Sequence, residues 1–147
     1  MLELLNNHVL WAAIAAMGVA QTFKVALILL TERRFAPERL LETGGMPSSH
    51  SAAVSALATG LGLSHGWDSP LFAVAATFGS IVIYDATGIR RAAGMQAELI
   101  NDLVRELSHV IDEGFQPTAL KTLLGHTYPQ VVVGALLGII TGIVLFI

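Results

Sequence analysis

Four apolar runs constrain the fold of this chain more than any other feature. They cover Val9 to Leu30, Ser51 to Leu63, Pro70 to Ala86 and Val131 to Ile147. A helix that crosses a bilayer needs about 20 apolar residues, because each residue adds about 1.5 Å. The first run has that length, and the shorter runs need flanking turns or burial in a bundle. Charged residues make up 13% of the 147 residues, against about a quarter in soluble domains. We therefore predict one all-α domain over residues 1–147, an integral membrane bundle of about four transmembrane helices.

Small residues in two of the runs indicate close helix packing. Gly134, Gly138 and Gly142 follow one another at four-residue spacing, the pattern that lets two helix backbones approach in lipid. The run from Ser51 to Leu63 consists almost entirely of Ala, Ser, Gly, Val and Leu. Both segments are expected to pack against neighbouring helices.

The long polar region between the third and fourth runs contains an amphipathic helix. Apolar residues recur there at helical spacing, with charged residues between them. The apolar residues are Ile100, Leu103, Val104, Leu107 and Ile111. Gly114 and Pro117 follow in the order typical of a helix end. We expect this cytoplasmic helix to lie along the membrane surface or to cap the bundle.

The basic residues fall on one side when the four runs are threaded alternately through a bilayer. They are Lys24, Arg33, Arg34, Arg39, Arg90, Arg91, Arg105 and Lys121. The positive-inside rule makes that side cytoplasmic. The net charge is only -3 and the basic residues form no dense cluster, so we expect no nucleic-acid partner.

Polar groups gather on the same side, at the start of the second run. The stretch GGMPSSHSA places Ser48, Ser49 and His50 there, while Lys24 lies within the first run and Asp85 lies near the end of the third. Each has an ordinary structural explanation: serine can cap a helix, lysine can snorkel, and aspartate can be a helix-end charge. Together, helix-start N–H groups, hydroxyls and cations make an anion pocket.

Two histidines on this side could carry out chemistry on a bound phosphate. His50 can serve as a general acid for a departing alkoxide, and His126 is free to be a nucleophile. The chain has no cysteine, which excludes thiolate nucleophiles and cysteine-bound metals. Phosphoryl transfer can proceed by charge neutralisation and positioning, so we expect no metal and no cofactor.

These residues resemble the superfamily of type-2 phosphatidic acid phosphatases and vanadium haloperoxidases. The order is Lys24 with Arg33 or Arg34, then Pro47-Ser48-Ser49-His50, then Arg90-Arg91 and His126. The stretches GGMPSSHSAAVSALATG, YDATGIRRAAGMQAELIN and LGHTYPQVVVGALLGI look like its short, divergent branch, the acid phosphatase/vanadium-dependent haloperoxidase-related proteins. Some relatives in that branch are phosphatidylglycerophosphate phosphatases of bacterial or plastid membranes.

The resemblance implies a role for each matching residue. His126 would form a phosphohistidine and His50 would protonate the leaving oxygen. From its place at the end of the third run, we also count Asp85 among the candidate catalytic residues. The phosphoryl oxygens would be held by Lys24, Arg33 or Arg34, Ser48, Ser49, Arg90 and Arg91. Gln130 stands four residues after His126, where the superfamily has an acidic residue. A neutral amide there could orient the imidazole but could not balance its charge.

The resemblance therefore implies a membrane phosphatase acting on a phosphorylated lipid, most simply phosphatidylglycerophosphate. Its site would face the cytoplasm of a bacterial inner membrane or the stroma of a plastid. The alternatives are an isoprenoid-diphosphate phosphatase, a vanadate-dependent haloperoxidase and a non-catalytic lipid-phosphate-binding protein. The expected partners are membrane lipids and the lipid substrate, and four short helices make a homodimer plausible.

Overall fold

A computed structural model describes residues 2–33, 35, 44–107, 118–122 and 124–146. Within these residues the regular secondary structure is entirely helical. The elements are α1 (Leu2–Leu5), α2 (His8–Glu32), α3 (Ser49–His65), α4 (Pro70–Thr87), α5 (Ile89–Leu107) and α6 (Tyr128–Val144). The four apolar runs correspond to α2, α3, α4 and α6, so the prediction of four apolar helices is confirmed.

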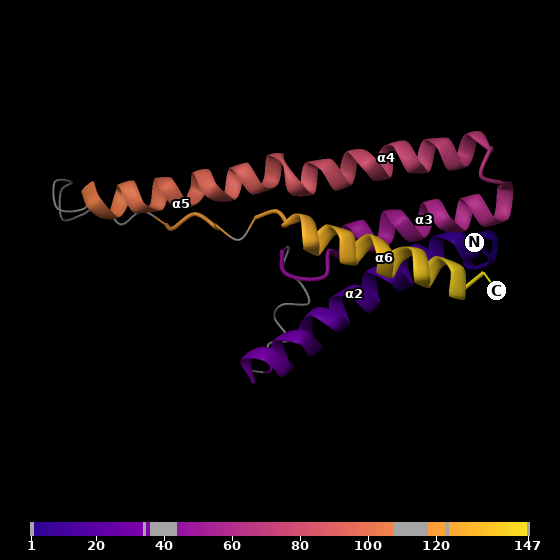
Figure 1. The fold of residues 1–147 in the computed structure, drawn as a ribbon, viewed down its shortest axis with the longest axis horizontal. Helices are drawn as coiled ribbons and strands as arrows, with labels where there is room; N and C mark the ends of the chain where they lie inside the picture. The colour runs from indigo at the N-terminus through magenta and orange to yellow at the C-terminus, as the bar shows by residue number, and fades with distance from the viewer. Residues whose placement is uncertain (1, 34, 36–43, 108–117, 123, 147) are drawn as a thin grey trace.

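Helix α3 lies at the centre and packs against α2, α4 and α6. Both ends of the chain lie near the turn between α3 and α4, whereas the start of α6 lies at the opposite end of the bundle (Figure 1). The helices thus alternate in direction, as the predicted threading requires.

The interior of the bundle contains small residues. Its core consists of Ala16 and Ala20 from α2 with Ala52 and Ala56 from α3, all fully buried. Gly138 of α6 lies so close to α3 that an added Cβ would overlap the carbonyl oxygen of Ala52. The predicted close packing of the glycine-rich helix is therefore confirmed, and small side chains are what permit it.

The large apolar side chains lie on the outside. Examples are Phe23, Leu30, Phe78, Ile81 and Ile140, each more than half exposed. This distribution, with small residues inside and large apolar ones outside, suits a bundle surrounded by lipid chains. Two described segments are long and apolar enough to cross a membrane, residues 8–32 and the combined α4 and α5 segment.

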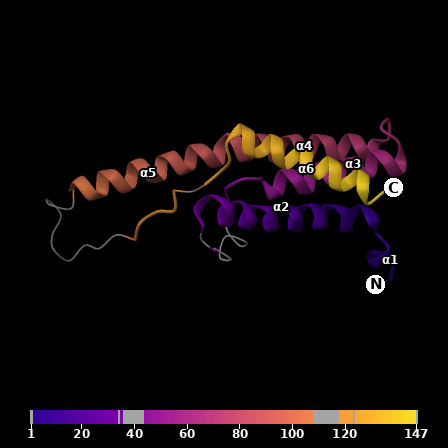
Figure 2. The same cartoon turned by 60° about the horizontal axis from the view of Figure 1, so that its bottom comes forward.

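The amphipathic helix differs from the prediction. It begins at Ile89 and continues from α4 after a single residue, Gly88. Helix α5 extends in nearly the same direction as α4, beyond the other helices (Figures 1 and 2), so the expectation that it caps the bundle is wrong. The predicted stop at Gly114 and Pro117 lies outside the described residues.

The chain returns along α5 in an extended segment, residues 118–122. Asn101 holds this segment with two hydrogen bonds: its side-chain amide donates to the Leu120 carbonyl and its side-chain oxygen accepts from the Leu120 N–H, both at 2.9 Å. Gly94 leaves room for the segment, because a Cβ there would lie 2.7 Å from the Thr122 carbonyl oxygen. These contacts guide the chain toward His126 at the start of α6.

Candidate functional site

His126 occupies the junction where α4 ends and α6 begins. Its backbone N–H donates to the Ala86 carbonyl at 2.9 Å. The preceding Gly125 has a φ of 79°, and a Cβ there would lie 2.5 Å from the Arg91 backbone nitrogen. Glycine is required by both the backbone conformation and the close approach, which together fix the position of His126.

The His126 side chain is buried without a partner among the described residues. The residue is 5% exposed, and neither ring nitrogen has a hydrogen bond. Burial, followed by the positive charge of Lys24 and smaller effects of His50 and Arg90, lowers the pKa of His126 to about 4. The ring is therefore neutral at physiological pH and keeps a lone pair on one nitrogen.

A cavity of about 250 Å³ opens beside this ring. Its polar lining comes from His50 near the start of α3, Asp85 near the end of α4, Arg90 at the start of α5 and His126. Apolar side chains complete the wall: Ile81, Val82, Ala86 and Leu124. The structure thus brings both predicted histidines together with one of the two adjacent arginines.

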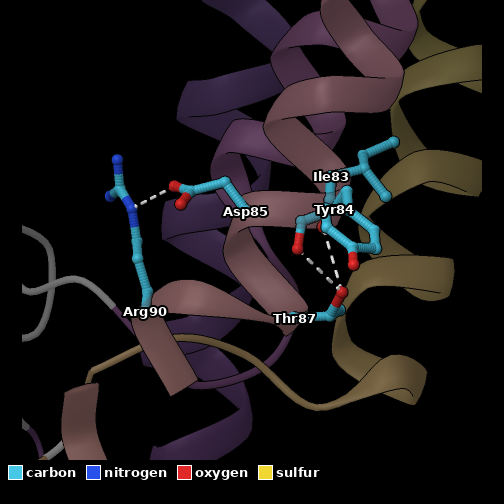
Figure 3. A network of polar contacts seen from close by, with 5 residues as sticks. All are labelled: Ile83, Tyr84, Asp85, Thr87 and Arg90. Carbon is cyan, nitrogen blue, oxygen red and sulfur yellow. Dashed lines mark hydrogen bonds and ion pairs between the residues drawn. The ribbon is translucent and has the colours of Figure 1, made fainter. Parts of the chain in front are cut away.

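Asp85 and Arg90 form an ion pair in this cavity. The Asp85 carboxylate accepts from Arg90 Nε at 2.6 Å (Figure 3). The pair joins the last turn of α4 to the first turn of α5 across Gly88. At the same joint, the Thr87 hydroxyl donates to the carbonyls of Ile83 and Tyr84 at 3.3 and 3.2 Å.

A second cavity of about 200 Å³ is also lined by residues 124–126. Arg91 lines it together with Gly44 and Gly45, and His126 belongs to both cavities. The two adjacent arginines therefore line different cavities, Arg90 the first and Arg91 the second.

Lys24 is almost completely buried, at 2% exposed, on α2. A Cβ on Gly45 would lie 3.5 Å from its Cδ, so the glycine loop packs along the aliphatic part of the lysine. The electrostatic effect of Lys24 on His126 places its charge near the site. A buried lysine near a neutral histidine fits the predicted anion pocket.

The remaining predicted phosphate ligands are less directly placed. Ser48 is fully buried, and its hydroxyl oxygen accepts from the Ser51 N–H at 3.3 Å and from the Ser51 hydroxyl at 2.9 Å. Ser48 is thus the N-cap of α3, as its ordinary structural explanation predicts, and Ser49 begins the helix. Arg33 is exposed at the end of α2, and Arg34 lies outside the described residues.

Comparison with known proteins identifies the family of this chain. The model of the Divergent PAP2 family matches residues 5–141. The chain belongs to this family. It is 46% identical over 153 aligned residues to the uncharacterized membrane protein YuiD of Bacillus subtilis (strain 168), covering 98% of this chain and 97% of the relative. No solved structure matches the chain.

Membership of the Divergent PAP2 family confirms the predicted resemblance. The structure also shows which contacts the Gln130 side chain makes. Its side-chain oxygen accepts from the Thr127 N–H at 3.0 Å, as part of a capping box at the start of α6. No hydrogen bond joins Gln130 to His126 in the described part of the chain. The predicted orienting contact is therefore absent there, although both residues line the second cavity.

Sequence reasoning missed several contributors to this Divergent PAP2 site. The apolar wall of Ile81 and Val82 is hidden within a continuous hydrophobic run, where no local pattern marks it. Gly125, directly before a candidate histidine in LGHTYPQ, was a usable signal, because glycine beside a functional residue often marks a close backbone approach. The Asp85–Arg90 pair spans five residues across a helix joint, a spacing at which side chains on one regular helix are not neighbours.

Proposed function

We propose that this protein is a membrane phosphatase that hydrolyses a phosphate monoester of a lipid through His126. One observation carries the proposal: a buried, neutral His126 with both ring nitrogens unpartnered among the described residues lines a cavity with His50 and Arg90. An unpartnered buried polar atom costs free energy, and a substrate phosphate would give this one a reaction partner.

The chemistry follows from these positions. The lone pair of His126 attacks phosphorus, the bond from phosphorus to the lipid oxygen breaks, and protonated His50 gives its proton to that oxygen. Water then attacks the phosphohistidine, the phosphorus–nitrogen bond breaks and returns its electron pair to His126, and His50 takes up a proton from the water. Lys24 and Arg90 supply positive charge for the phosphoryl oxygens in both steps.

A lipid substrate is supported by the lining and surroundings of the cavity. Its wall of Ile81, Val82, Ala86 and Leu124 is apolar, and Ile81 is itself 57% exposed on the outer face of α4. An acyl-bearing molecule could contact such a wall while its phosphate meets His50 and Arg90. Phosphatidylglycerophosphate is the specific substrate that we propose, with the site facing the cytoplasm.

The test is phosphate release by the purified protein in detergent micelles. Phosphatidylglycerophosphate, phosphatidic acid and an isoprenoid diphosphate would be compared, with His126→Ala as the control. We expect release from phosphatidylglycerophosphate that depends on His126. Faster phosphate release from the isoprenoid diphosphate would make that compound the substrate. Bromide oxidation with added vanadate, without phosphate release, would indicate a haloperoxidase.

A second candidate, a lipid-phosphate-binding protein without turnover, is favoured by the role of Gln130. Its carboxamide oxygen is engaged in capping α6, and the position carries no negative charge to stabilise a protonated imidazole. Such a protein would bind lipid phosphate through Lys24 and Arg90 but would release no inorganic phosphate from it. Binding and phosphate release measured on the same preparation separate the two candidates.

A further inference from the structure

Asp85 is the carboxylate that lines the His126 cavity in the described part of the chain. A carboxylate is an unfavourable neighbour for a phosphate, because like charges repel. In the structure, however, its charge is engaged by Arg90. The contact therefore suggests that Asp85 acts on the arginine rather than on the substrate.

The geometry of the contact leaves the useful part of Arg90 available. Asp85 accepts from Nε at 2.6 Å, the nitrogen nearest the aliphatic chain. A guanidinium has five N–H donors, four of them on its two terminal nitrogens. Holding Nε restricts the plane of the guanidinium, while the two terminal nitrogens can still donate hydrogen bonds to two oxygens of a phosphate.

The positive charge of Arg90 acts on His126, as expected if Arg90 binds the phosphate that His126 attacks. It is one of the causes that lower the pKa of His126, and it lines the same cavity as His50. The Asp85 side chain is less exposed than that of Arg90, 32% against 55%. The less exposed carboxylate thus tethers a more exposed and otherwise adaptable cation.

We propose that Asp85 is a positioning residue, which holds Arg90 by Nε so that its terminal nitrogens bind the substrate phosphate beside His126. This inference rests on the proposed function, in which that cavity receives the phosphate. It selects Arg90, rather than Arg91, as the arginine that clamps the transferred phosphoryl group.

A competing explanation is that the pair only stabilises the joint between α4 and α5. Thr87 provides the matched control, because its hydroxyl bonds belong to the same joint but do not touch Arg90. Asp102 provides a second control, since it pairs with Arg105 farther along α5. Thr87→Val and Asp102→Asn should leave phosphate binding unchanged.

The experiment measures the Kd of inorganic phosphate, and the KM and kcat for p-nitrophenyl phosphate, on full-length protein in micelles. Asp85→Ala should weaken phosphate binding by on the order of tenfold and raise KM more than it lowers kcat. Asp85→Asn should recover most of the binding, because its amide oxygen can still accept from Nε. The double variant Asp85→Ala/Arg90→Ala should be no worse than Arg90→Ala alone.

Four results would overturn the positioning role. They are tighter phosphate binding by Asp85→Ala, additive losses in the double variant, losses in Thr87→Val equal to those in Asp85→Ala, and no recovery of phosphate binding in Asp85→Asn. A wild-type protein that binds phosphate in this pattern but releases none from any ester would overturn the proposed function and support the positioning role. Phosphate release that is unchanged in Asp85→Ala would support the proposed function and overturn the positioning role.

Discussion

At the scale of the residue, the site depends on how the backbone around His126 is held. Gly125 lets the chain pass against the Arg91 backbone, and the His126 N–H is bonded to the end of α4. These contacts bury the ring where it stays neutral. A neutral imidazole can attack phosphorus at neutral pH, which a protonated one cannot.

The two histidines should respond differently to the leaving group. His50→Ala should slow hydrolysis of an alkyl phosphate by on the order of a hundredfold or more, but much less for an aryl phosphate with an acidic phenol, because that oxygen needs little protonation. His126→Ala should abolish turnover of both. The measurement is initial phosphate release from paired alkyl and aryl substrates, together with trapping of a phosphoprotein. A His126→Ala protein that still forms the phosphoprotein would assign the nucleophile elsewhere.

Burial of His126 also predicts a pH dependence of stability. Its pKa is about 4 in the folded protein, against an ordinary value of 6.5 for a solvated histidine. Between these values the unfolded chain binds a proton that the folded protein does not. The free energy of unfolding should therefore fall as pH decreases from about 6.5 to about 4, by on the order of 3 kcal/mol.

Denaturant unfolding in mixed micelles at several pH values tests this prediction. His126→Gln removes the titrating group and should flatten the dependence in that window. His8→Gln, at an exposed position near the start of α2, serves as the control and should keep the wild-type slope. The same slope in all three proteins would show that His126 is accessible to protons in the folded state.

At the scale of the element, α3 and α6 approach closely because their facing residues are small. Gly134 lies against the Ser48 backbone, Gly138 against Ala52 and Gly142 against Thr59 and Ala56. This contact places Ser48 beside α6, where its N–H donates to the Gln130 carbonyl at 3.0 Å. The same packing therefore brings the starts of α3 and α6, and with them His50 and His126, to one end of the bundle.

Much of this level could be predicted from the sequence. The four apolar runs indicated α2, α3, α4 and α6, and the four-residue glycine spacing indicated the close packing of α6 against a neighbouring helix. The joint at Gly88 could not be predicted, because the apolar periodicity of α5 becomes clear only from Ile100 onward. The separation of Arg90 from Arg91 into two cavities depends on that joint and on the course of residues 118–126, which are tertiary features without a local signal.

Gly138→Ala should destabilise the bundle, because its Cβ would overlap the Ala52 backbone and the two helices would have to separate. We expect a loss of on the order of 2 kcal/mol, measured as a lower midpoint of unfolding in micelles. Gly18→Ala is the matched control: a Cβ on this residue of α2 would meet nothing within 4 Å, and alanine favours helix. Equal destabilisation by both variants would contradict the close packing of α3 and α6.

At the scale of the whole molecule, the two ends of the bundle differ in charge and chemistry. The described basic residues Lys24, Arg33, Arg90, Arg91, Arg105 and Lys121 belong to the end where α2 finishes and α6 starts, or to the α5 extension beyond it. The opposite end holds the α3–α4 turn and the ends of the chain (Figure 1).

Helices α4 and α5 together span 38 residues, which is roughly 57 Å at 1.5 Å per residue. The hydrocarbon core of a bilayer is only about 30 Å thick. Most of α5 should therefore lie outside the hydrocarbon, on the side of the site.

The positive-inside rule turns this asymmetry into a prediction of orientation: the end that carries His50 and His126 should face the cytoplasm. The native chain has no cysteine, so single cysteines report topology without background. Ser64→Cys lies near the α3–α4 turn and Thr118→Cys on the extended segment beside α5, and both positions are exposed. In intact bacterial cells, a membrane-impermeant maleimide should label Ser64→Cys alone, and Thr118→Cys should react only in inverted vesicles. The parent protein is the control for non-specific labelling. Labelling of Thr118→Cys from outside intact cells would place the site on the opposite face of the membrane. A site on that face would have no access to a lipid phosphate made in the cytoplasmic leaflet.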